Sequence, residues 1–130
     1  MKINSLSNSK IRGTNFVYEK IKLFDFYKLR WIEGANINPR QCPESDLFTV
    51  DIIFHYETDK QECYLIMFRF LEVRQLVFPS FSPYAFVSEI ELEDVSCDQL
   101  EGISFQMLDR GQSDFLVQCK SIEIISCETC

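Results

Sequence analysis

Two apolar runs around a short polar turn dominate the pattern of this chain. The first run covers residues 47–56, the second covers residues 63–78, and residues 57–62 between them are mostly polar. Both runs are rich in β-branched and aromatic residues, which favour strands, and the polar segment has an ordinary hairpin-loop length. The sequence therefore predicts an antiparallel hairpin around which the rest of the fold is built.

The alternation of side chains within this hairpin predicts which faces are buried. In the first strand every second residue from position 48 on is apolar, whereas the opposite face is mixed and holds Asp51 and His55. Such a strand has one covered face, so we expect Asp51 and His55 on its less buried side. The second strand, residues 63–73, is apolar on both faces, and we expect it to be the more central one. Arg69 lies within it and needs an acidic or carbonyl partner if it is buried.

Three further strands are predicted after this hairpin. They cover residues 85–95, 103–108 and 115–125, of which the last two form a second hairpin. In the first of them we expect Phe86, Ile90 and Leu92 to share one face. In the last, the parity of the apolar positions changes at residues 120–121. That change predicts either a β-bulge or a strand that passes between two packing surfaces.

The first part of the chain has a weaker pattern. We expect a loosely ordered start over residues 1–15 and a loop over residues 32–46, which hold a glycine and two prolines. Residues 16–31 fit either one or two strands or a short helix. Their aromatic content favours strands.

Taken together, these elements predict a mainly β protein. Six to eight strands joined mostly by short turns indicate an antiparallel sandwich or a partly open barrel, with at most one or two short helices. A chain of 130 residues is expected to form a single domain over residues 1–130 with its own core. No apolar run reaches the roughly 18 residues of a membrane span, and the start lacks the apolar region of a secretory signal, so we expect no membrane association.

The net charge of −7 is unevenly distributed. Residues 1–40 contain eight basic and three acidic side chains, whereas the remaining ninety residues contain five basic and seventeen acidic ones. An acidic body repels the phosphates of nucleic acids, so we expect no nucleic-acid binding. A basic protein is the more suitable partner.

An acidic segment of the predicted strand 85–95 is the candidate partner-binding surface. Its candidate residues are Glu89, Glu91, Glu93, Asp94, Asp98 and Glu101. The three glutamates project from one strand face about 6.5 Å apart, and no basic residue occurs between positions 88 and 102. The alternatives are a calcium site and a solvated strand face whose charge discourages aggregation.

Residues with catalytic chemistry are few. His55 is the only histidine, so any His-based triad or metal site would depend on it, although a lone strand histidine is more often structural. No nucleophile-elbow pattern and no Gly-rich phosphate loop occurs. We therefore expect a non-enzymatic protein with no catalytic residues, no metal and no cofactor.

Six cysteines are present, at positions 42, 63, 97, 119, 127 and 130. Cys63 and Cys119 lie in apolar runs, where free thiols act as small hydrophobic side chains. Cys127 and Cys130 form a lone CxxC pair, whereas zinc usually needs two such pairs or a pair with two histidines. We interpret that pair as chance, and we expect reduced cysteines and a cytoplasmic location.

Two segments resemble parts of small bacterial β proteins. They are CYLIMFRFLEVRQLVFPS, residues 63–80, and FLVQCKSIEIISC, residues 115–127. Some families of this kind are immunity proteins of polymorphic toxin systems, and the resemblance extends over residues 47–126. It implies a non-enzymatic protein that binds and neutralises a cognate toxin, and the acidic residues would suit a basic toxin. The alternative function is a small-ligand-binding β barrel or sandwich lined by aromatic residues, and a homo-oligomer is compatible with both.

Overall fold

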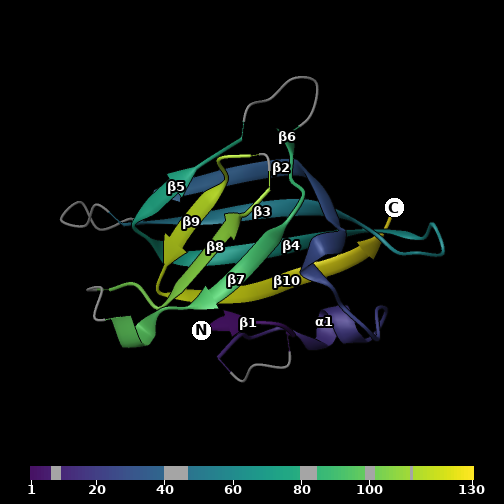
Figure 1. The fold of residues 1–130 in the computed structure, drawn as a ribbon, viewed down its shortest axis with the longest axis horizontal. Coiled ribbons are helices and arrows are strands. Elements are labelled where there is room, and N and C mark those ends of the chain that lie inside the picture. Colours follow the sequence, from purple (N-terminus) through teal and green to yellow (C-terminus); the bar gives the residue numbers. More distant parts are fainter. Residues whose placement is uncertain (7–9, 40–46, 80–84, 99–101, 112) are drawn as a thin grey trace.

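The strands form two antiparallel sheets of five strands each, stacked face to face (Figure 1). This holds for the part of the chain that the structure, a computed structural model, describes: residues 1–6, 10–39, 47–79, 85–98, 102–111 and 113–130. The expected mainly β fold is confirmed, and the architecture is sandwich-like. No helix of the described residues is long and apolar enough to cross a membrane.

The strand order in each sheet differs from the chain order. The first sheet runs β1 (Lys2–Ile3), β7 (Ile90–Asp94), β8 (Phe105–Asp109), β9 (Leu116–Cys119) and β5 (Gln75–Val77). The second sheet runs β10 (Ser121–Thr129), β4 (Cys63–Val73), β3 (Phe48–Glu57), β2 (Leu29–Pro39) and β6 (Ala85–Phe86). The helical turns are α1 (Asn15–Tyr18), η1 (Phe26–Lys28) and η2 (Ser96–Asp98).

The predicted central hairpin is confirmed as β3 and β4, which pair along their whole length. The four apolar residues of β3 at positions 50, 52, 54 and 56 are fully buried, whereas Ile53 and His55 on its other face are only partly buried. Asp51 lies on that same face, but it is only 8% exposed, so the expectation of a less buried position holds for His55 and is wrong for Asp51, which pairs with Arg69. Arg69 has the expected acidic partner, because its Nε and Nη2 donate to the two carboxylate oxygens of Asp51 at 2.8 and 3.0 Å. The expectation that β4 is the more central strand is wrong: β3 occupies the middle of the sheet.

The central position of β3 follows from β2, which sequence reasoning assigned mostly to a loop. β2 begins at Leu29 and continues to Pro39, and it pairs with β3 along its length. The pairing shifts register between Ile32 and Gly34, so the glycine is accommodated at an irregularity of the strand. The proline lies at the strand end. The predicted loop over 32–46 is therefore wrong up to position 39, and its remaining residues lie outside the described ranges.

Of residues 16–31, for which the sequence favours strands, only 29–31 are strand, at the start of β2; residues 16–18 lie in α1, 26–28 lie in η1, and 19–25 connect them through turns and bends. Asp25 caps η1, since its carboxylate accepts a hydrogen bond from the backbone amide of Tyr27 at 2.9 Å. Val17, Phe24 and Phe26 are buried along this segment, so its aromatic content serves the core without strand geometry.

The described part of residues 1–15, expected to be loosely ordered, takes part in the fold. β1 pairs with β7, and Leu6 and Ile11 are buried. Gly13 has a φ of +78°, and a Cβ there would collide with the backbone carbonyl of Ile124. A glycine is therefore needed where the N-terminal segment approaches β10.

The predicted strand 85–95 is divided between the two sheets. β6 pairs with β2 at Trp31 and Ile32, whereas β7 pairs with β1 and β8. Phe86 is 52% exposed while Ile90 and Leu92 are buried, so the expected common face of these three residues is wrong. Strand alternation cannot carry through the intervening residues 87–89, because the chain changes sheets there.

The parity change near residue 120 has the same origin. β9 belongs to the first sheet and β10 to the second, so the chain passes between two packing surfaces at Lys120. This confirms the second of the two predicted alternatives. A separate register shift lies further along β10, between Ile124 and Ser126.

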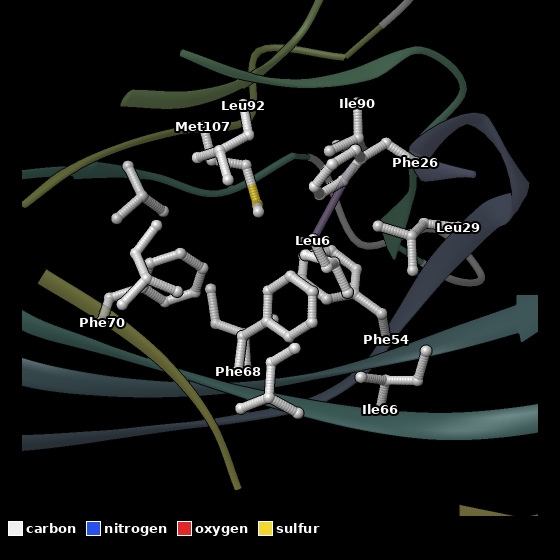
Figure 2. Packing of buried hydrophobic residues seen from close by; sticks show 14 of the residues in the cluster. Leu6, Phe26, Leu29, Phe54, Ile66, Phe68, Phe70, Ile90, Leu92 and Met107 are labelled. Carbon is white, nitrogen blue, oxygen red and sulfur yellow. The ribbon is translucent and has the colours of Figure 1, made fainter. Parts of the chain in front are cut away.

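The core fills the space between the sheets (Figure 2). Phe54, Phe68 and Phe70 of the second sheet face Ile90, Leu92 and Met107 of the first, as Figure 2 shows. The Phe54 ring makes edge contacts with the rings of Phe68 at 5.6 Å and Phe115 at 5.8 Å between centroids. These rings therefore join both sheets in one hydrophobic cluster.

Replacing Phe54 by Ala should lower the free energy of unfolding by about 3–5 kcal/mol, because it removes a fully buried ring and leaves a cavity. Urea unfolding followed by far-UV circular dichroism measures this loss. The matched control is Leu23→Ala, at a side chain 87% exposed, which should change stability by less than about 0.5 kcal/mol. Equal losses for both variants would contradict the assigned core.

Asp109 holds the crossing between β6 and β7 in place. Its side chain is 8% exposed and accepts hydrogen bonds from the backbone amides of Ser88 (3.1 Å), Glu89 (2.9 Å) and Gly111 (2.8 Å), and from the hydroxyl of Ser113. Burial alone would raise the pKa of Asp109, but these four donors together hold it below its ordinary value of 3.8.

The lowered pKa of Asp109 predicts a pH-dependent contribution to stability. The unfolded carboxyl binds a proton more readily, so the contribution is complete above pH 3.8 and is lost as the pH falls through the folded pKa. Asp109→Asn should cost about 1–3 kcal/mol of unfolding free energy at pH 7, and the difference from wild type should shrink below pH 3.8. Urea titrations at a series of pH values measure this. Asp114→Asn, at an exposed carboxylate of the same turn, is the control and should change the free energy of unfolding by less than about 0.5 kcal/mol at pH 7.

Candidate functional site

Two of the predicted acidic residues, Glu91 and Glu93, lie on β7 on the outward side of the first sheet, and Asp94 ends that strand. Glu91 and Glu93 alternate with the buried Ile90 and Leu92, so they point away from the core. The structure brings these two carboxylates and Asp94 together on one strand. Glu89 precedes the strand and is exposed. Asp98 ends η2 with a side chain that the structure does not describe, and Glu101 lies outside the described residues.

Basic side chains from distant parts of the chain pair with these carboxylates. Arg110 contacts Glu91 at 3.3 Å and Glu93 at 2.6 Å. Lys2 lies 3.3 Å from Glu91, and Lys10 lies 2.7 Å from Asp94. The phenol of Tyr27 also donates to Glu91 at 3.0 Å. The local stretch of sequence is free of basic residues, but the folded surface is not.

These contacts favour the ionised forms of Asp94 and Glu91. The Lys10 ammonium, with the hydroxyl and amide of Ser96, holds the pKa of Asp94 far below its usual range. Partial burial would raise the pKa of Glu91, but hydrogen bonds from Tyr27, Lys2 and Arg110 lower it overall. The negative charges are thus present and largely compensated within the chain, which reduces the net field available to steer a basic partner.

A shallow hollow lies between β1, η1 and β7, where Lys2, Tyr27 and Glu91 line it. Its volume is about 100 Å³. Pockets for small organic ligands usually measure about 300–1,000 Å³. This hollow therefore gives no support to the small-ligand-binding alternative.

The outward side of the second sheet has a different character. A set of apolar and aromatic side chains from β2, β3, β4 and β6 lies there, each partly buried or exposed. We name it the aromatic face, and it consists of Trp31, Ile53, His55, Leu65, Met67 and Phe86. Cross-strand register places Phe86, Trp31, His55 and Leu65 side by side in one row. The acidic strand β7 and the aromatic face are therefore on opposite sides of the sandwich.

Aromatic stacking fixes the centre of the aromatic face. The rings of Trp31 and His55 stack with centroids 3.8 Å apart and an interplanar angle of 10°. The Phe86 ring meets Trp31 edge-on, at 6.1 Å and 83°. The indole nitrogen of Trp31 donates to the carboxylate of Glu33 at 2.7 Å. Trp31 is thus held from three directions.

Two cysteines lie beside His55 at the edge of the aromatic face. Cys63 opens β4 and forms a disulfide with Cys130, which follows the last residue of β10. The sulfur of Cys130 lies 3.8 Å from Nδ1 of His55. One ligand atom from each of the three residues lies within 4.8 Å of the other two. Among the described residues, these three side chains form a group that could hold a metal ion, and solvent reaches it at the exposed Cys130.

The disulfide corrects the expectation that the cysteines are reduced, as far as Cys63 and Cys130 are concerned. The physical reason is the register of β10, which runs antiparallel to β4 and brings Cys130 opposite Cys63 with Cα atoms 5.4 Å apart, a normal disulfide spacing. Cys127 of the CxxC pair is buried and points into the core, so the two cysteines of that motif do not act together.

Two of the remaining described cysteines, Cys119 and Cys127, are buried free thiols. Burial raises the pKa of Cys119 to about 12, and burial also raises the pKa of Cys127. Both thiols are therefore protonated at neutral pH and pack as small hydrophobic groups. This agrees with the interpretation of Cys119 from the sequence. Cys97 is exposed, and Cys42 lies outside the described residues.

The sequence did not predict this cluster, for a physical reason. His55 on β3 and Cys63 on β4 lie on either side of the same turn and on the same face of the sheet. Strand alternation could therefore have placed them near each other. Trp31 and Cys130 belong to β2 and to the end of β10, and no sequence signal gave the register of those strands. The face that the hairpin turns to solvent, rather than the acidic strand, holds this group of residues.

Comparisons with protein-family models, with curated proteins and with solved structures find no match to this chain. The resemblance to immunity proteins of toxin systems therefore stays a prediction, and functional inference has to come from the two surfaces described above.

Reducing the disulfide should destabilise the fold in metal-free buffer, because the bond closes a loop between residues 67 positions apart. We expect a loss of about 2–4 kcal/mol in the free energy of unfolding. Urea unfolding with and without a phosphine reductant measures it. Cys130→Ser should show the same loss without reductant and no further loss with it. Cys97→Ser is the control and should respond to reductant like the wild type.

Proposed function

We propose that this chain is a non-enzymatic protein-binding module that contacts its partner through the aromatic face. The observation that supports this is the row of Phe86, Trp31 and His55 on the outward side of the second sheet, continued by Leu65. Such residues usually belong in a core, yet Phe86 is 52% exposed. Contiguous apolar surface of this kind is typical of interaction sites.

The composition of the aromatic face suits the centre of a protein interface. Aromatic residues and Met are enriched in interface cores, and Trp is prominent among residues that dominate binding energy. Trp31 is already held by His55, Phe86 and Glu33, so little side-chain freedom remains to be lost when a partner covers it. The face is formed by strands, which keeps it rigid.

The charges at the border of the aromatic face indicate the chemistry of the partner. Glu33 accepts from the Trp31 indole, Glu128 pairs across strands with Leu65, and Glu57 follows His55 on the same strand face. Arg69 lies on the same side of the sheet, where it is paired with Asp51 and lies 3.9 Å from Glu123. The partner we propose presents an apolar anchor surrounded by basic residues.

A basic toxin neutralised by this chain fits that description and is the biological role we propose, in line with the resemblance in its sequence. Glu89, Glu91, Glu93 and Asp94 would then form a second surface that is weaker for binding, because internal cations compensate most of it. The cytoplasm remains the proposed location. The Cys63–Cys130 disulfide counts against it, since disulfides are rare in that compartment.

The test compares variants on the two sides of the sandwich. The tagged wild-type chain is used to capture partners from the native organism, with the product of the neighbouring gene as the first candidate, and binding is then measured with purified proteins. Phe86→Asp should weaken the affinity at least about 30-fold, corresponding to about 2 kcal/mol at an interface centre. Because Phe86 is half-exposed, this substitution should leave the fold intact, which circular dichroism checks.

Glu89→Lys is the matched control on the opposite side. It also changes the charge at an exposed position, and we expect less than about a threefold change in affinity. A loss confined to Glu89→Lys would move the binding surface to the acidic strand. Undiminished binding by both variants would rule out both surfaces as the interface.

A further inference from the structure

His55, Cys63 and Cys130 have the donor set of a metal site. They come from β3, from β4 and from just beyond β10, and a ligand atom from each lies within 4.8 Å of the others. Thiolate and imidazole are ligands that Zn²⁺ prefers. In a tetrahedral zinc site with Zn–S bonds of about 2.3 Å, the ligand atoms lie roughly 3.8 Å apart. The Nδ1–Sγ distance between His55 and Cys130 is 3.8 Å, which meets this requirement already.

The disulfide decides whether this donor set is available. With the Cys63–Cys130 bond formed, neither sulfur is a thiolate and only the imidazole remains as a strong ligand. After the bond is broken, the two sulfurs need to separate to about 3.8 Å. Cys130 lies beyond the last strand residue and its side chain is exposed, so a rotation of that side chain is enough.

We propose that His55, Cys63 and Cys130 form a redox-gated zinc site, which binds Zn²⁺ after the disulfide has been reduced. A dithiol reductant supplies two electrons and two protons and is itself oxidised to a disulfide, while the Cys63–Cys130 bond breaks to give two thiols. Binding of Zn²⁺ then displaces the two thiol protons and forms two Zn–S bonds. The Nδ1 atom of His55 supplies the third ligand, and a water molecule takes the fourth position.

Trp31 makes the proposed site observable. It is the only tryptophan in the chain, and its ring stacks on His55 at 3.8 Å. The stacking restricts rotation of the imidazole, so Trp31 acts as a positioning residue. The intrinsic fluorescence of the chain reports directly on the environment of His55. A metal ion bound to that imidazole should change it.

The experiment titrates the full chain with Zn²⁺ in two redox states. One sample is kept oxidised, and the other is reduced with a phosphine, which leaves the thiols free. Calorimetry and Trp31 fluorescence should show saturable binding of one Zn²⁺ per chain in the reduced sample, and binding at least about tenfold weaker in the oxidised sample. Titration with Co²⁺ should give the visible absorption of a tetrahedral, sulfur-ligated ion in the reduced sample.

Variants test the identity of the ligands. His55→Gln and Cys130→Ser should each weaken Zn²⁺ binding by the reduced chain at least about tenfold. Both replace side chains outside the core, and circular dichroism verifies folding. Cys97→Ser is the control, since Cys97 is exposed and is not a member of the cluster, and it should bind like the wild type.

Three results would overturn the proposal. The first is absence of saturable Zn²⁺ binding by the reduced wild-type chain. The second is equal affinity in the oxidised and reduced samples, which would remove the redox gate. The third is a loss with Cys97→Ser as large as that with Cys130→Ser, which would show that scattered thiols bind the ion. None of these results depends on the identity of a protein partner.

Discussion

The burial of the inward face of β3 and β4 against the first sheet is the interaction on which the rest of this structure depends. Phe54 and Phe68 project from that face, and the Phe54 ring also contacts Phe115 of the opposing layer. A sheet that buries one face this completely has its other face fixed by strand alternation. The outward positions of His55, Leu65 and Met67 are a consequence of this packing.

The two outward faces of the sandwich differ in the side chains that they expose to solvent. On the first sheet, the acidic residues of β7 meet Lys2, Lys10 and Arg110, so charge is compensated within the chain. On the second sheet, aromatic rings stack on one another and stay partly exposed. A compensated polar surface is stable in water as it stands, whereas exposed apolar surface gains free energy when it is covered. This difference is why we place the proposed interface on the second sheet.

The cysteine cluster connects the proposed binding surface to the stability of the fold. The Cys63–Cys130 bond joins the beginning of β4 to the residue that follows β10, at the border of the aromatic face. Figure 1 shows the chain end, marked C, beyond β10. His55 belongs both to that face, through Trp31, and to the cluster, through Cys130. A change in the redox or metal state of the cluster would therefore act on a residue at the centre of the proposed interface.

The sequence by itself determined the β class, the central hairpin, the buried residues of β3 and the need of Arg69 for an acidic partner. These features depend on local alternation and on hairpin pairing, both of which are short-range in the chain. It did not reveal β2 beyond its first residues, because Gly34 and Pro39 favour a loop, and only pairing with β3 outweighs that preference.

Tertiary structure alone decided the character of both surfaces. Glu91 lacks a basic neighbour in the sequence, yet folding brings it Lys2 and Arg110. His55 is a lone histidine in the sequence, yet the registers of β2 and β10 bring it Trp31 and Cys130. Register between distant strands is set by the packing of the whole core, and no local pattern specifies it. The same hairpin that the sequence identified as the centre of the fold thus also holds the candidate site, on the face that it turns to solvent.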